Sequence, residues 1–152
     1  MLRLVNGSWQ SFLGPQSDDG RQYFEIEYST ANNRLFALRA DPQSNWLMDV
    51  WEPKDNDIWG QAGSPKIMPS GGNISLPDVG GTALALNGAT GNLFNVNTGA
   101  ASLSVIDVAT VVDIGSVGLG TDPFAIAIDE SRNQVYVGLR DGGALIKLED
   151  VY

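Results

Sequence analysis

Residues 121–137 read TDPFAIAIDESRNQVYV, and this stretch decides the fold class. Apolar residues alternate with others from Phe124 to Ile128, a polar turn follows, and Val135-Tyr136-Val137 resumes the alternation. Alternation with period two over short runs, bounded by turn-forming residues, is the pattern of half-buried β-strands. A third run, Ala144 to Leu148, follows the turn Asp141-Gly142-Gly143. The C-terminal third is therefore predicted to be a three-stranded meander.

The same plan recurs upstream, which predicts a chain built from one repeated unit of four short strands. The strands predicted in the middle are Ala83 to Leu86, Leu93 to Val96, Leu103 to Ile106 and Val111 to Ile114. Those predicted before them are Phe24 to Tyr28, Leu35 to Leu38, Trp46 to Trp51 and Ile58-Trp59. The segment Asn6-Gly7-Ser8-Trp9 resembles the hinge between a third and a fourth strand, so two more strands are expected at the N-terminus.

Three turns between first and second strands align on an aromatic residue in the second strand. Asn33 precedes Phe36, Asn92 precedes Phe94, and Asn133 precedes Tyr136. We expect each Asn to take a left-handed backbone conformation, which its side chain tolerates in tight turns. The aromatic residues are unequally spaced, because 94 − 36 is 58 and 136 − 94 is 42. The surplus lies in residues 64–81, which are rich in Pro and Gly and are predicted to be one long inserted loop.

A repeat of about forty residues with four strands is typical of a β-propeller blade. Residues 121–137 resemble a YVTN- or NHL-type propeller repeat, with Pro123 opening the inner strand, Asp129 and Asn133 framing the turn, and Val135-Tyr136-Val137 as the second strand. Residues 104–107 resemble the matching third strand. The resemblance covers residues 103–148 best and implies a propeller architecture, without catalytic residues.

The predicted strands do not suffice for a ring, although residues 1–152 are expected to form a single domain. They number 2 + 4 + 4 + 3, or 13 strands in about three blades, whereas propellers usually have about four to eight blades. We expect homo-oligomerisation or a larger assembly to complete the ring. An open array or a sandwich is the alternative.

Composition excludes several classes of function. The net charge of −9 repels phosphate backbones and anionic membranes, so no nucleic-acid partner is expected. No apolar run is long enough to span a membrane, and none at the N-terminus resembles a signal peptide. Cysteine and histidine are absent, which removes thiol nucleophiles and the commonest general base and metal ligand. We therefore predict that the chain is not an enzyme and has no cofactor and no metal site.

A carbohydrate-binding lectin is the first alternative, because Trp9, Trp51 and Trp59 could stack on sugar rings while Asp49 and Asp57 accept hydroxyl hydrogen bonds. The same tryptophans could equally pack between neighbouring blades or at a subunit contact. A carboxylate-based hydrolase or lyase is the second alternative. It would need Glu25 and Asp49 to converge in one pocket, and a solvated strand face is the simpler interpretation of these acids.

The favoured function is a non-catalytic interaction or structural module that binds a protein partner or its own copies. The loop of residues 64–81 is the expected contact element, through Ile67, Met68, Ile74 and Leu76. Such a scaffold would suit a soluble protein at a cell or virion surface, where repeated blades present loops to a partner.

Overall fold

The computed structural model is all-β and describes residues 2–5, 8–11, 23–40, 46–51, 73–75 and 81–151. Side chains are described for residues 25–38, 48–50 and 83–151. Within this part of the chain the one helical element is the 3₁₀ turn η1 (Asp141–Gly143), and no helix is long and apolar enough to cross a membrane.

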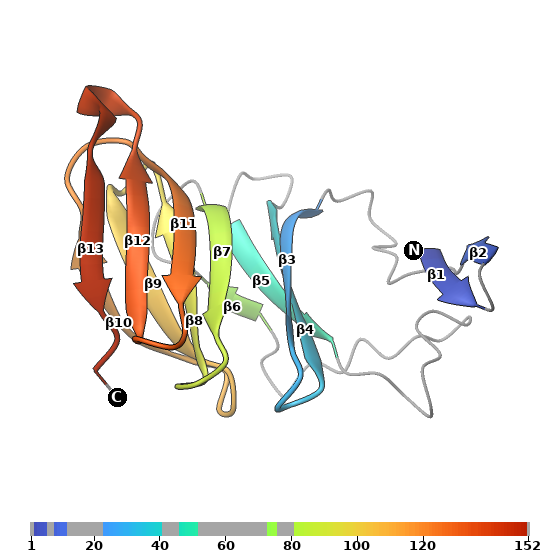
Figure 1. The fold of residues 1–152 in the computed structure, drawn as a ribbon. Coiled ribbons are helices and arrows are strands. Elements are labelled where there is room, and N and C mark those ends of the chain that lie inside the picture. Colours follow the sequence, from blue (N-terminus) through green and yellow to red (C-terminus); the bar gives the residue numbers. More distant parts are fainter. Residues whose placement is uncertain are drawn as a thin grey trace.

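The described strands form four antiparallel sheets, each of which follows the chain as a meander (Figure 1). The first sheet is the hairpin β1 (Leu2–Val5) and β2 (Ser8–Ser11). The second sheet contains β3 (Tyr23–Ser29), β4 (Arg34–Ala40), β5 (Trp46–Trp51) and β6 (Asn73–Ser75). The third contains β7 (Gly81–Asn87), β8 (Asn92–Asn97), β9 (Ser102–Asp107) and β10 (Val112–Gly118). The last contains β11 (Pro123–Asp129), β12 (Gln134–Leu139) and β13 (Leu145–Glu149).

The all-β prediction and the grouping of strands into sets of two, four, four and three are confirmed for the described residues. One strand lies elsewhere than predicted. The strand that pairs with β5 as the fourth of its sheet is β6, with Ile74 opposite Met48, and Ile58-Trp59 lies outside the described residues. Residues 64–81 are therefore not one uninterrupted loop, since they contain β6 and the first residue of β7. A three-residue strand carries almost no periodic signal, and its role is to pair with the edge of β5.

The repeat is closer in the structure than in the sequence. The first strands β3, β7 and β11 each have seven residues. Each also has a shift in register, of the kind that a β-bulge produces, between its first and third residues. The second strands β4, β8 and β12 then place Phe36, Phe94 and Tyr136 at the same position.

The turn before each second strand has one residue with a left-handed backbone, as expected, but the predicted position is wrong in one of the three. Asn33 has φ 52°, Asn133 has φ 51°, and the third such residue is Gly91 with φ 78°. Glycine adopts this conformation without steric cost, so the turn does not need Asn92. Asn92 is instead the first residue of β8, and its side chain is free to bond elsewhere.

The larger sheets pack face to face in chain order. Strand β7 contacts both β3 and β11, so the first strands of the three sheets stand side by side (Figure 1). One core lies between β3–β6 and β7–β10 and includes Phe36, Met48, Leu93 and Ile106. A second core lies between β7–β10 and β11–β13 and is formed by residues such as Phe94, Leu103, Val135 and Val137. The middle sheet thus has a neighbouring sheet on each face, although its outer strand β10 is mostly exposed.

Candidate functional site

One face of each large sheet is directed toward the next sheet along the chain, and the register identifies its central positions. In β3–β6 these positions are Glu27, Phe36, Leu38, Met48 and Val50. In β7–β10 the matching residues are Ala85, Phe94, Val96, Leu103 and Val105. In β11–β13 they are Ala127, Tyr136, Gly138, Leu145 and Lys147. The first two sets face a neighbouring sheet, and the third faces away from the rest of the described chain.

Burial follows this difference directly. Phe36 and Leu38 are 0% exposed and Phe94 and Val96 are 4% and 0% exposed, whereas Leu145 is 68% exposed. Phe124, at the bulge of β11, is also 41% exposed. We call this open surface the terminal face and define it by Phe124, Ala127, Tyr136, Gly138, Leu145 and Lys147. Its residues match those of two buried interfaces in strand and register, but no described sheet covers it.

The end of the terminal face next to Leu145 is apolar and closely packed. A Cβ atom added to Gly138 would lie 3.7 Å from the Phe124 ring and 3.6 Å from the Ala125 side chain. The guanidinium carbon of Arg140 lies 5.2 Å from the centre of the Phe124 ring, within the range of a cation–π interaction. Arg140 also forms an ion pair with Asp122, with 3.5 Å between Nε and Oδ2. The exposed Phe124 ring is therefore held in place on the surface.

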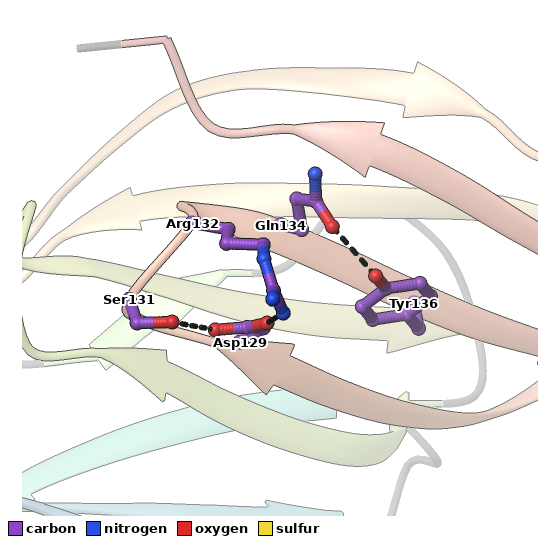
Figure 2. Close-up of polar contacts among 5 residues, drawn as sticks. All are labelled: Asp129, Ser131, Arg132, Gln134 and Tyr136. Atoms are coloured by element: carbon purple, nitrogen blue, oxygen red, sulfur yellow. Dashed lines mark hydrogen bonds and ion pairs between the residues drawn. The ribbon is translucent and has the colours of Figure 1, made fainter.

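The turn end of the terminal face is polar, as Figure 2 shows. Asp129 accepts hydrogen bonds from the Ser131 hydroxyl at 2.5 Å and from Arg132 Nη1 at 2.6 Å. These bonds, the Ser131 bond first, hold the pKa of Asp129 below its ordinary value. The Tyr136 hydroxyl donates to Gln134 Oε1 at 2.6 Å. The polar groups at this end thus bond to one another within their own sheet.

The matching residues of the other two sheets bond to the next sheet instead. Arg34, the first residue of β4, donates to the carbonyl oxygens of Val108 at 3.0 Å and Ala109 at 2.9 Å. Asn92, the first residue of β8, donates to Asp150 Oδ1 at 2.7 Å. Gln134, the first residue of β12, occupies the same position on the terminal face. The first residue of the second strand therefore links neighbouring sheets at the two internal interfaces and bonds within its own sheet on the terminal face.

The contact between the middle and last sheets centres on Asp150, which follows β13 and is 7% exposed. Besides Asn92, it accepts hydrogen bonds at Oδ2 from Asn87 Nδ2 at 2.8 Å and from the Thr90 hydroxyl at 2.5 Å. Glu130 Oε1 accepts a further bond from the Gly88 N–H at 2.9 Å. These groups fix two turns of neighbouring sheets against each other and satisfy both oxygens of the Asp150 carboxylate.

The residues predicted to bind a ligand do not form a described site. Asp49 is 2% exposed, so a ligand on the surface would not reach it. Trp9 lies in β2 opposite Leu4, and Trp51 lies in β5 opposite Leu35, but their side chains are outside the description. Trp59, Asp57, Ile67, Met68 and Leu76 lie outside the described residues altogether, and Ile74 is placed only as part of β6.

The carboxylates proposed for a hydrolase are not brought together. Glu25 pairs with Leu38 and Asp49 pairs with Ala37, adjacent residues of β4. Neighbouring residues of a strand point to opposite faces, so Glu25 and Asp49 lie on opposite sides of the sheet. Within the described residues no group of three or more acidic side chains could hold a metal ion.

Glu27 is an acid on a strand face that lies at an interface between large sheets. It occupies the position of Ala85 and Ala127, on the face of β3 that is directed toward β7–β10. Burial raises its pKa above the ordinary 4.5, a backbone hydrogen bond opposes this rise, and the charge of Glu25 adds to it. A folded-state pKa above the unfolded value means that the folded chain binds this proton more tightly. The charged carboxylate therefore lowers stability as the pH rises through this range.

Glu27→Gln is expected to raise the free energy of unfolding at pH 7, by less than about 1 kcal/mol because the side chain is only half-buried. The two proteins should be equally stable near pH 3.5, where Glu27 is protonated in both states. Urea unfolding at the two pH values measures the difference, with Glu149→Gln, at an exposed position of β13, as the control. A stabilisation that is equal at both pH values would contradict an origin in the charge.

Comparison with known proteins identifies the fold and not a family. No family model matches the sequence, and no curated protein matches it. Among solved structures, hydrazine synthase from Kuenenia stuttgartiensis is similar, with a TM-score of 0.65 and 10% sequence identity. The match covers 86% of this chain and 46% of that chain, so this chain spans about half the length of the similar structure. At this identity the likeness concerns the arrangement of strands alone.

No signal within a single strand identifies the terminal face, and sequence analysis missed it. Its residues become visible only when β4, β8 and β12 are aligned as RLFALRA, NLFNVN and QVYVGL. The third residue is aromatic in all three, and the fifth changes from Leu38 and Val96 to Gly138. The signal in the sequence is therefore a comparison between repeats, in which one strand face is less apolar in the last repeat than in the two before it.

Proposed function

We propose that the chain is a non-catalytic interaction and structural module of the propeller type, with its three larger sheets as blades and the terminal face as its partner-binding surface. One observation carries the proposal. The faces of β3–β6 and β7–β10 are each covered by the next sheet, whereas the matching face of β11–β13 is exposed. The exposed Phe124 and Leu145 side chains on this face favour a protein partner over solvent. The proposed partner is a protein, because the open positions match positions that other strands of this chain cover.

The separation of Glu25 from Asp49 supports the non-catalytic part of the proposal. Glu25 and Asp49 lie on opposite faces, and the chain has no histidine and no cysteine. The similar solved structure is named as an enzyme, but 10% identity carries no argument about catalysis in this chain. Nothing among the described side chains favours the lectin alternative, since none of its tryptophan side chains is described.

The blade arrangement has a specific signature in distances between the sheets. Under the proposal the resemblance of residues 103–148 to YVTN- or NHL-type repeats reflects blades that turn around a common axis. Three sheets around an axis lie on an arc, whereas three sheets in a straight stack lie on a line. Ala31, Ala89 and Ser131 occupy matching exposed positions in the turns after β3, β7 and β11, so they can report this difference.

Spin labels at these three positions, attached in pairs through introduced cysteines, test the arrangement. The natural chain has no cysteine, so each variant carries only the intended labels. The 31–131 distance is expected to be about 1.4 to about 1.8 times the average of the 31–89 and 89–131 distances, as geometry requires for rings of four to eight blades. A 31–131 distance equal to the sum of the other two would indicate a straight stack and contradict the proposal.

A further inference from the structure

The sheet β3–β6, at the opposite end of the three larger sheets from the terminal face, has an exposed strand that complements this face. Ile26 and Tyr28 of β3 are 57% and 43% exposed on the face directed away from β7–β10. Their matching residues are Leu84 and Leu86 in β7, and Ile126 and Ile128 in β11. All four of these matching residues pack against the preceding sheet. The outward face of β3 and the terminal face of β11–β13 therefore correspond to the two sides of an interface that the chain forms twice internally.

We infer that the partner of the terminal face is a second copy of this chain, docked head to tail through β3. The inference rests on the blade arrangement proposed above and names the partner of the same surface. At both internal interfaces the aromatic residue of the second strand, Phe36 or Phe94, belongs to the core that also contains the first strand of the next sheet. Tyr136 of one copy would lie in the same relation to Ile26 and Tyr28 of the other.

The contact is centred on β3 rather than on the whole outward face of its sheet. On that face Leu35, Ala37 and Asp49 are already buried within the single chain, at 9%, 3% and 2% exposure. The first strands also come closest to one another at the internal interfaces, where the backbone of β3 approaches β7, and that of β11 approaches β7 and β8. In the proposed contact, β3 of the second copy would therefore lie against the terminal face as a first strand lies against the preceding sheet inside the chain.

Head-to-tail contacts between different patches close into a ring when the rotation between copies allows it. Each chain contributes three sheets of three or four strands besides the β1–β2 hairpin. Two copies would contribute six such sheets, which falls within the range of about four to eight blades in known propellers. The expected species is a dimer in which both terminal faces are covered.

Light scattering and sedimentation over a range of chain concentrations test the inference. The wild-type chain should form dimers, and Leu145→Ser and Ile26→Ser should each raise the dissociation constant about tenfold or more, as expected when a buried aliphatic side chain is lost. Val112→Ser is the matched control, because Val112 is 53% exposed but lies on β10, outside both faces. Each chain carries a net charge of −9, so about 0.15 M salt is included to screen repulsion.

Comparing the two variants separates a head-to-tail contact from other modes of association. In the closed dimer each contact joins the terminal face of one copy to β3 of the other, so Ile26→Ser and Leu145→Ser each change both contacts and should each weaken the dimer. If the terminal face instead paired with itself, Ile26→Ser would have no effect. Thermal unfolding of each variant verifies that the monomer is folded, as expected for changes at exposed positions.

A wild-type chain that stays monomeric up to its solubility limit would overturn the inference, as would an Ile26→Ser variant that dimerises like wild type. The spin-label distances, measured in the Leu145→Ser background, distinguish this failure from that of the proposed function. Curved-array distances without self-association would reject the second copy as partner and leave the propeller-type module standing. Straight-stack distances would reject both.

Discussion

Phe94→Ala is expected to lower the free energy of unfolding by about 3–5 kcal/mol. Phe94 is 4% exposed and belongs to the core between β7–β10 and β11–β13, together with Val96, Leu103, Val135 and Val137. Removing its ring leaves a cavity between two sheets, which costs both the transfer free energy of the ring and the packing contacts around it. Urea unfolding followed by tryptophan fluorescence measures the change in midpoint and slope.

Tyr136→Ala is the internal control for this prediction, because Tyr136 occupies the matching position on the terminal face. Its expected cost in the isolated chain is about 1 kcal/mol or less, the range of ordinary surface substitutions. Both variants are compared in the Leu145→Ser background, since self-association would stabilise the folded state in proportion to chain concentration. Equal losses at the two positions would show that the terminal face is covered within the single chain.

The strands were predictable from sequence because their signals are local. Alternation in residues 124–128 and 135–137, bounded by turn residues, reflects one face turned toward a neighbouring sheet. The middle sheet was predictable for the same reason, although a neighbouring sheet packs on each of its faces. Its β8 is buried at all six positions and still contains three Asn residues, of which Asn95 and Asn97 are buried with hydrogen bonds.

The features that sequence analysis missed depend on partners that are distant in the chain. Strand β6 exists because β5 has an edge to pair, and its three residues carry no pattern of their own. The left-handed residue of the second turn was assigned to Asn92 because Asn is common there, but the adjacent Gly91 takes it at no steric cost. The terminal face was missed because exposure is set by whether another sheet covers a strand, which no single strand encodes.

The role of Asp150 is the clearest case of such dependence. Counting from the pairing of Asn92 with Asp107 and of Gln134 with Glu149, Asp150 occupies the position that Val108 occupies in the middle sheet. Both residues donate their N–H to the turn of their own sheet, Val108 to Gly91 O at 3.0 Å and Asp150 to Asn133 O at 2.8 Å. Val108 offers its carbonyl oxygen to Arg34, whereas Asp150 offers its carboxylate to Asn92. An acidic residue after a strand would ordinarily be interpreted as a solvated turn residue.

Asp150→Ala is therefore expected to lower the free energy of unfolding by about 3–5 kcal/mol, as when one partner of a buried charged network is removed. The substitution leaves the amides of Asn87 and Asn92 without the acceptor they share, in a site where both are at most 3% exposed. Asp129→Ala is the matched control, because that carboxylate is partly exposed and bonds to Ser131 and Arg132 in its own turn. Its removal should change stability little.

A double-mutant cycle of Asn92→Ala with Asp150→Ala assigns the loss to the bond between the two sheets. Once Asp150 is absent, Asn92→Ala removes an unsatisfied amide instead of a hydrogen bond, so the double variant should be more stable than the sum of the single losses predicts, by about 0.5–3 kcal/mol. Additive losses would mean that Asp150 stabilises the fold through contacts other than its hydrogen bond to Asn92. A loss for Asp150→Ala no larger than that for Asp129→Ala would mean that the turns of neighbouring sheets are held by the apolar core and not by this carboxylate.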